Sequence, residues 1–298
     1  MIDFQPFTLE NRELINRYLQ LGGYQSCEYC FEGFYLWQNS YQDSFAVLGD
    51  FMIIRSVSAE GVGYLAPIGR GDAKEAIEKL RAHNAQTGEK LKFLRVSSDN
   101  LDRFQSVLDR FEMVRKRDLD DYIYRAESLA QLPGKKLHPK RTHINKFQRL
   151  YENWSYEPIT EANLGECVEM NREWCRDHNC TMSGDLQSES TACFRGLKYF
   201  KILGMLGGLI RVNGKVVAFT VASPLYPGSN TVVVHFEKAL REYEGAYTMI
   251  NQQFAQSVAG RYEYIDREED MGVEGLRKAK LSYCPEIMKE KYTLLAKD

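Results

Sequence analysis

Apolar residues in the first 130 positions either alternate or recur at helical spacing, with turn-forming residues between the segments. Residues 45–48 and 51–54 flank Gly49-Asp50, which is typical of a β-hairpin. Asp72-Ala73-Lys74-Glu75 has the form of a helix capping box, and Gly88 marks the expected end of that helix. The other predicted elements of this half are strands over 62–68, 91–96 and 122–124 and a helix over 101–111.

The pattern repeats beyond residue 134 with longer segments. Residues 206–212 and 215–223 meet across Asn213-Gly214, and Asn-Gly supplies the two positive-φ positions of a type I′ turn. This dipeptide therefore predicts the most secure hairpin of the chain. The other predicted elements are strands over 154–159, 231–237, 262–267 and 292–295, and helices over 164–175, 192–203, 244–259 and 274–280.

Both halves predict the same class of fold, an α/β (α+β) arrangement in which a mostly antiparallel sheet is flanked by helices. The chain has 298 residues, which is more than a single core usually holds. Leu132-Pro133-Gly134 is the expected boundary, because Pro and Gly interrupt both helices and strands. We therefore expect two domains, 1–133 and 134–298, the first being a degenerate copy of the second.

Charge is distributed unevenly along the chain. The net charge is −2, from 39 Lys and Arg against 41 Asp and Glu, yet residues 135–149 hold six of the positive residues and no acidic one. The rest of the chain has a balance of −8. A basic helix of this kind is either a solvated connection between domains or a surface for RNA, another phosphorylated ligand or an anionic membrane. The residues expected to bind phosphate or RNA are Lys136, Lys140, Arg141, His143 and Lys146, with Phe147 or His143 as the stacking partner.

The termini and the cysteines indicate a cytoplasmic protein. The N-terminus shows no basic region followed by an apolar one, and the longest apolar run, 202–210, is about half of what a bilayer requires. The seven cysteines are irregularly spaced, which fits free thiols. Cys27 and Cys30 form an isolated C-x-x-C pair, which we interpret as two ordinary thiols in preference to a metal or redox site. We expect no metal.

Several sequence blocks resemble one bacterial family. They are Asp121-Tyr122-Ile123-Tyr124, Lys140-Arg141-Thr142-His143-Ile144-Asn145-Lys146-Phe147, His235-Phe236-Glu237-Lys238-Ala239, Asp266-Arg267-Glu268-Glu269-Asp270-Met271-Gly272 and Gly275-Leu276-Arg277-Lys278-Ala279-Lys280-Leu281-Ser282-Tyr283-Cys284-Pro285. The family is largely uncharacterised and is related to the C-terminal domain of phosphatidylglycerol lysyltransferase. The resemblance covers nearly the whole chain. It implies a tandem GNAT fold, shared with lysyltransferases and with Fem-type peptidyl transferases. Such relatives use aminoacyl-tRNA as the donor.

The loop before the long helix favours aminoacyl-tRNA over coenzyme A as the donor. Acetyltransferases of the GNAT fold hold its pyrophosphate with a Q/R-x-x-G-x-G/A loop before the long helix, whereas this chain has Arg241-Glu242-Tyr243-Glu244-Gly245-Ala246. Only one glycine is present, and two carboxylates lie where phosphates would bind. Carboxylates favour a helix N-terminus for the same reason as phosphates, so they compete with them. The sequence identifies no cofactor.

Acyl transfer needs a base for the acceptor and an acid for the leaving group. His235 and Glu237 are two residues apart on a predicted strand and are therefore expected on one face, where either could be the base. The GNAT resemblance implies that Tyr283, after the last short helix, is the acid. The alternative is that all three are structural.

Charged residues follow the strand that ends near residue 266. They are Asp266, Arg267, Glu268, Asp270, Arg277 and Lys280. Such a cluster either binds the amine of a donor amino acid or forms a structural network of salt bridges.

Together these features predict an acyltransferase that moves an aminoacyl or related acyl group to an unidentified amine or hydroxyl. One alternative is a non-catalytic protein that binds tRNA or a phosphorylated ligand. The other is an acyl-CoA-dependent N-acetyltransferase.

Overall fold

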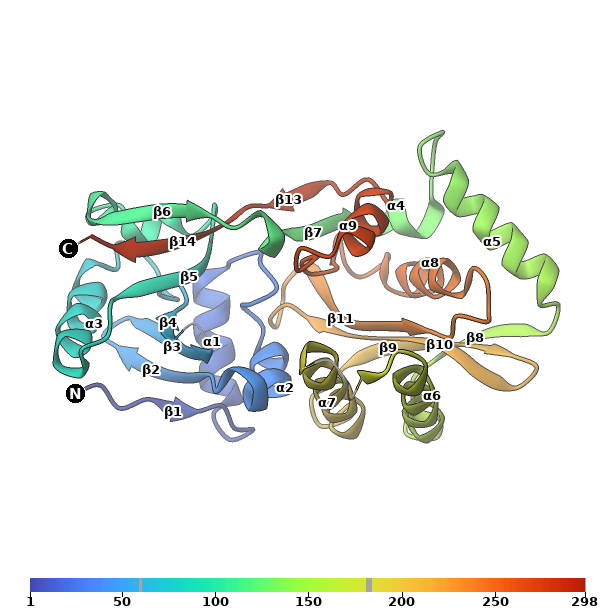
Figure 1. The fold of residues 1–298 in the computed structure, drawn as a ribbon, viewed down its shortest axis with the longest axis horizontal. Coiled ribbons are helices and arrows are strands. Elements are labelled where there is room, and N and C mark those ends of the chain that lie inside the picture. Colours follow the sequence, from blue (N-terminus) through green and yellow to red (C-terminus); the bar gives the residue numbers. More distant parts are fainter. Residues whose placement is uncertain (59–60, 181–183, 298) are drawn as a thin grey trace.

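The first of two seven-stranded sheets contains most of the N-terminal half of the chain (Figure 1). The computed structural model describes residues 1–58, 61–180 and 184–297. In spatial order the strands of this first sheet are β1 (Gln5–Pro6), β2 (Ser44–Leu48), β3 (Phe51–Ser58), β4 (Gly61–Tyr64), β5 (Lys92–Ser97), β14 (Lys291–Ala296) and β6 (Phe111–Arg115). All neighbours are antiparallel except β4 and β5.

The second sheet contains most of the C-terminal half. Its strands are, in spatial order, β13 (Ile287–Lys289), β7 (Asp121–Arg125), β12 (Tyr264–Asp266), β11 (Thr231–Ala239), β10 (Lys215–Pro224), β9 (Leu206–Val212) and β8 (Trp154–Pro158). Here β11 and β12 form the parallel pair. The predicted α/β class with mostly antiparallel sheets is therefore confirmed.

Two strands lie in the sheet opposite to the expected one. Residues 122–124 were expected to close the first unit but belong to the second sheet, and residues 292–295 were expected to end the second unit but lie between β5 and β6 of the first. The chain crosses between the sheets after β6 and returns after β13, and these two crossings run beside each other (Figure 1). The division at residues 133 and 134 remains a prediction, but it does not separate the strands of the two sheets.

Helices cover the sheets on both sides. They are α1 (Arg12–Gly22), α2 (Phe31–Tyr41), α3 (Lys74–Thr87), α4 (Ala126–Gln131), α5 (His138–Leu150), α6 (Leu164–Asp177), α7 (Gly184–Lys198), α8 (Ala246–Val258) and α9 (Glu274–Leu281). Helix α8 lies on one face of the second sheet, and α6 and α7 lie on the other (Figure 1). One apolar core joins the halves, because Phe34 of α2 belongs to the same buried cluster as Trp174 of α6 and Phe236 of β11.

The structure corrects two local predictions in the first half. Residues 101–111 do not form one helix but two short 3₁₀ turns, Leu101–Phe104 and Leu108–Arg110, before β6. The capping box is incomplete: the Asp72 carboxylate accepts a hydrogen bond from the Lys74 amide at 2.8 Å, whereas Glu75 pairs with Lys79. Gly88 ends α3 in the left-handed conformation, as predicted.

Buried charges lie at the joint where the strands are exchanged. The ammonium of Lys291, on β14, is 2.5 Å from Asp121 Oδ1 on β7 and 2.5 Å from Glu28 Oε1. All three side chains are at most 5% exposed. Burial opposes the charge of Lys291, but Asp121, Cys27 and Glu28 outweigh it and raise the Lys291 pKa. Lys291 is the first residue of β14 and Asp121 is the first residue of β7. Their ion pair therefore connects the two sheets.

The Asn213-Gly214 hairpin gives the first prediction. Both residues have positive φ, 50° and 84°, and an added Cβ at Gly214 would meet no atom within 4 Å. Because only the backbone conformation resists a side chain, Gly214→Ala should lower the free energy of unfolding by about 1 kcal/mol in urea titration. Gly275→Ala is the matched control: it lies in α9, also meets nothing, and should be neutral or slightly stabilising. Equal effects at both positions would contradict the turn assignment.

Candidate functional site

A β-bulge separates the two residues that were expected to share a strand face. Val221 pairs with Phe236 and Ala222 with Val234, so His235 is an extra residue on β11. The bulge shifts the alternation of side chains. As a result His235 contacts Cys30, which precedes α2, whereas Glu237 contacts Asn251 of α8 on the other face. The prediction of a common face is therefore wrong, and the candidate site divides into two.

Glu237 lies in the first part, at the α8 face. Its Oε1 accepts a hydrogen bond from Arg267 Nη2 at 2.7 Å, and its Oε2 accepts one from Asn251 Nδ2 at 3.2 Å. The Glu237 side chain is 9% exposed. Arg267 follows β12, the strand parallel to β11, so the two parallel strands bring this pair together. Sequence reasoning missed Asn251, although a polar residue within the apolar stripe of a buried helix is a detectable signal.

Tyr283 is the second residue of this part. The Arg267 guanidinium carbon lies 5.0 Å from the centre of the Tyr283 ring, and the Lys140 ammonium lies 3.9 Å from it. Burial raises the pKa of Tyr283, so the hydroxyl keeps its proton at neutral pH. Glu237 and Tyr283 thus both contact the guanidinium of Arg267.

His235 belongs to the second part, with a hydroxyl and a thiol. Its Nε2 is 2.9 Å from Ser223 Oγ, and its Nδ1 is 3.2 Å from Glu268 Oε1. Cys30 Sγ is 3.3 Å from the same Ser223 oxygen. Burial lowers the pKa of His235 to about 4, so the ring is neutral at physiological pH. The order Ser–His–Glu resembles a hydrolase triad, but Ser223 and Cys30 are completely buried, which indicates a satisfied internal network.

The charged residues after β12 mostly bind one another. Asp270 pairs with Arg277 at 2.8 Å and accepts a hydrogen bond from Tyr122 at 2.5 Å. Lys280 Nζ donates to the carbonyl oxygens of Arg267, at 2.6 Å, and of Glu268, at 3.2 Å. The sequence allowed two roles for this cluster, amine binding or a structural network. The contacts of Asp270, Arg277 and Lys280 fit the structural network.

Asp266 is a completely buried carboxyl group near the joint, and Glu268 beside it is partly buried. Burial raises the pKa of both, with Asp121 adding to the effect on Asp266 and Glu269 to that on Glu268. Of these two carboxyl groups, Glu268 contacts a residue predicted to be catalytic, namely His235. The binding of a substrate amine by these residues stays a prediction.

One group of described residues offers three ligand atoms close enough for a metal ion. Cys27 Sγ, Asp121 and Glu269 lie within 4.8 Å of one another. The Lys291 ammonium lies among them, 2.5 Å from Asp121 and 3.6 Å from the Cys27 sulfur. Since an ammonium already supplies the positive charge, these residues fit a buried salt bridge better than a metal. The second cysteine of the C-x-x-C pair, Cys30, is directed to Ser223 instead.

Two members of the basic segment have partners within the chain. Arg141 donates to the carbonyl oxygens of Leu132 and Gly134, and Lys146 pairs with Glu244 at 2.6 Å. Phe147 is completely buried and cannot stack on a base, so that prediction is wrong. His143 is exposed on α5, and Lys136 is exposed before the helix begins.

Helix α5 covers the loop that would hold the pyrophosphate of coenzyme A. Gly245 precedes α8 with a φ of 88°, and a Cβ there would lie 3.0 Å from the His143 carbonyl oxygen and 3.1 Å from Phe147 Cβ. The loop is therefore in contact with α5.

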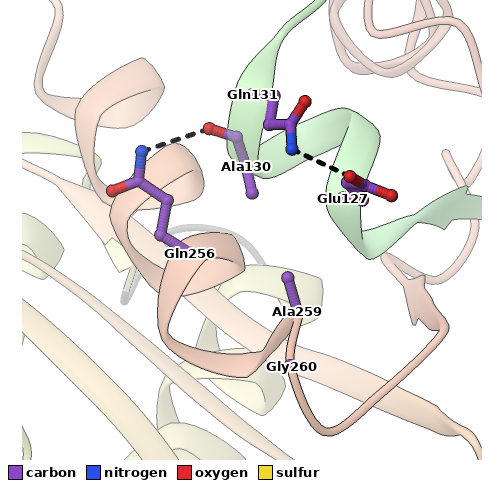
Figure 2. Close-up of a pocket in the computed structure, with 6 residues that line it drawn as sticks. All are labelled: Glu127, Ala130, Gln131, Gln256, Ala259 and Gly260. Carbon is purple, nitrogen blue, oxygen red and sulfur yellow. Dashed lines mark hydrogen bonds between the residues drawn. The ribbon is translucent and has the colours of Figure 1, made fainter.

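A hollow between α4 and α8 lies apart from both groups (Figure 2). It is lined by Glu127, Ala130, Gln131, Gln256, Ala259 and Gly260. Gln256 donates to the Ala130 carbonyl oxygen at 3.1 Å, and Gln131 to Glu127 at 2.8 Å. None of the predicted site residues lines it.

The family of the chain follows from a match over nearly its whole length. Residues 20–295 match the family model described as "Phosphatidylglycerol lysyltransferase, C-terminal". The chain belongs to this family. The resemblance drawn from the sequence blocks is thereby confirmed. The family and its fold relatives are acyltransferase-like.

Solved structures agree on the fold. A conserved protein of unknown function from Bacteroides thetaiotaomicron is 38% identical, with full coverage of both chains and a TM-score of 0.94. L-PGS from Bacillus licheniformis is 15% identical over 99% of this chain and 93% of that one, with a TM-score of 0.65. A tandem GNAT protein from the clavulanic acid biosynthesis pathway is 8% identical over 99% and 98%, with a TM-score of 0.53. The tandem GNAT-like fold is thus established.

An uncharacterised protein of Mycoplasmoides gallisepticum is 27% identical over 174 residues, which are 58% of this chain. The match spans about half, 54%, of that protein. Within the described residues, no helix has the length and apolar character needed to traverse a bilayer.

The Asp270 network gives a pH prediction. Burial works against its charge, but hydrogen bonds from Arg277 and Tyr122 outweigh burial and lower the Asp270 pKa from 3.8 to about 2. A lowered pKa in the folded state stabilises the fold above the unfolded value, by about 2 kcal/mol, and this contribution disappears as the pH falls through 2. In urea titrations between pH 5 and pH 2, Asp270→Asn should therefore show a smaller loss of stability than the wild type.

The matched control is Asp118→Asn, which removes the exposed second carboxylate partner of Arg277. It should keep the pH dependence of the wild type. An Asp270→Asn variant with unchanged pH dependence would contradict the assignment.

Proposed function

We propose that this chain is an acyltransferase that moves an aminoacyl or related acyl group from an aminoacyl-tRNA-type donor to an amine or hydroxyl acceptor. The observation that carries the proposal is the meeting of Glu237 and Tyr283 on Arg267, at the ends of the parallel strands β11 and β12. The family description, which names a lysyltransferase, supports an aminoacyl donor.

The residues suit a single displacement step. The acceptor nitrogen or oxygen forms a bond to the acyl carbon, and the ester bond to the ribose oxygen of the donor breaks. Glu237 takes the proton of the acceptor, and Tyr283 gives its proton to the leaving oxygen. Solvent then returns both residues to their starting states. The raised pKa of Tyr283 fits this role, because the residue is protonated before the step.

The contact between α5 and the loop at Gly245 supports a donor other than coenzyme A. A pyrophosphate needs free backbone amides and close approach at this helix N-terminus. The His143 carbonyl oxygen lies against the glycine there, and the Glu244 carboxylate beside it already binds Lys146. This agrees with the sequence-based expectation.

A transfer assay tests the proposal. The donor is tRNA charged with labelled amino acids, and a total lipid extract and a soluble metabolite extract are separate acceptor arms. Label should enter one acceptor fraction, and Glu237→Gln and Tyr283→Phe should each lower the rate about 100-fold, as loss of a general base or acid does.

Matched controls are Glu274→Gln, at an exposed glutamate of α9, and Tyr292→Phe, on β14 of the other sheet; both should retain the wild-type rate. Wild-type rates in the two site variants would contradict the site. Retention of charged tRNA without any transfer would instead favour a non-catalytic binding protein.

A further inference from the structure

Two positive side chains lie on the same tyrosine ring, and only one of them has an acidic partner. Lys140 of α5 and Arg267 after β12 both contact Tyr283, at 3.9 Å and 5.0 Å from the ring centre. Arg267 binds Glu237. Lys140 is half-buried and has no carboxylate within 4 Å among the described residues. The group therefore carries one uncompensated positive charge.

The guanidinium of Arg267 also has an unused donor. Its Nη2 binds Glu237, but its Nη1 is buried and has no hydrogen-bond partner in the described part of the chain. Buried donors are rarely left without a partner, because the missing hydrogen bond costs about 1–3 kcal/mol. Burial, and then Arg267, lower the pKa of Lys140, which is the effect of a cation without a counter-ion.

The neighbouring charged residues have other partners and do not neutralise Lys140. Lys280 approaches the same loop, but its ammonium donates to the backbone carbonyl oxygens of Arg267 and Glu268. Glu268 contacts His235 on the other face of the sheet. In the basic segment, Arg141 donates to a backbone carbonyl oxygen and Lys146 pairs with Glu244, whereas Lys140 lies over the Tyr283 ring.

We propose that Lys140, Arg267 and Tyr283 form a binding site for a phosphate group. A guanidinium N–H without a partner and an ammonium that contact the same tyrosine ring are donors from which a tetrahedral phosphate oxyanion accepts hydrogen bonds. The assignment of phosphate, in preference to another anion, rests on the proposed function, because a tRNA donor and a phospholipid acceptor both carry phosphodiesters. Phosphate binding can be measured whether or not transfer occurs.

Titration calorimetry with inorganic phosphate at low ionic strength is the direct test. We expect saturable binding at one site by the wild type and at least about tenfold weaker binding by Lys140→Gln, because a charged hydrogen bond contributes about 1.5–3 kcal/mol. Lys201→Gln is the matched control: it removes the same charge from an exposed lysine outside the basic segment and should bind phosphate as the wild type does. No saturable binding, or equal weakening in both variants, would overturn the proposal.

Competition then distinguishes the two sources. The trinucleotide CCA and monomeric dihexanoyl-phosphatidylglycerol are each titrated against bound phosphate. Displacement by CCA alone supports an RNA phosphate, and displacement by the lipid alone supports a headgroup phosphate. If neither displaces it, the bound phosphate is an adventitious ion only and the proposal is wrong.

The transfer assay separates this proposal from the proposed function. Wild-type transfer kinetics in Lys140→Gln would overturn the phosphate site and leave the acyl transfer standing. Lys140-dependent phosphate binding by a wild type that transfers nothing would overturn the acyl transfer and leave the phosphate site standing.

Discussion

The arrangement of the two sheets depends on an ion pair that is removed from water. Lys291 and Asp121 are the first residues of the two exchanged strands, and neither side chain is exposed. A buried charge without its partner is strongly destabilising, so each strand requires the other at this point. Glu28, from the segment before α2, is a second carboxylate partner of Lys291. The two sheets therefore meet along the exchanged strands as well as across the apolar core shared by α2 and the second sheet.

The bulge at His235 determines which side chains of β11 lie on each face of the second sheet. One extra residue on β11 places two groups with different chemistry on the two faces of the same strand. The α8 face holds a carboxylate, a guanidinium and a protonated tyrosine near the basic helix α5. The α2 face holds a neutral histidine within a buried network. The first arrangement combines a carboxylate, a protonated tyrosine and positive charge, and for that reason the proposed acyl transfer is placed there.

The fold class and the Asn213-Gly214 hairpin could be predicted because they depend on local periodicity and local turn geometry. The strand exchange could not, because β7 and β14 are short strands whose sequences do not identify their neighbours. The common face of His235 and Glu237 failed because the bulge is set by the pairing with β10. Phe147 failed as a stacking residue because it is buried in a core cluster with residues of α8, which is distant in sequence. Tyr283 was predicted from a resemblance and Glu237 from its place on a predicted strand, and both contact Arg267 in the structure.

A double-mutant cycle on Lys291 and Asp121 tests most directly whether the buried pair joins the two sheets. The free energies of unfolding of Lys291→Met, Asp121→Leu and the double variant are measured by urea titration against the wild type. Lys291→Met should cost about 3–5 kcal/mol, because it leaves buried carboxylates without their cation. Asp121→Leu should cost less, because Lys291 keeps Glu28 at 2.5 Å, and the coupling energy should be about 2–3 kcal/mol. A coupling energy below about 0.5 kcal/mol, as found for exposed pairs, would contradict the account.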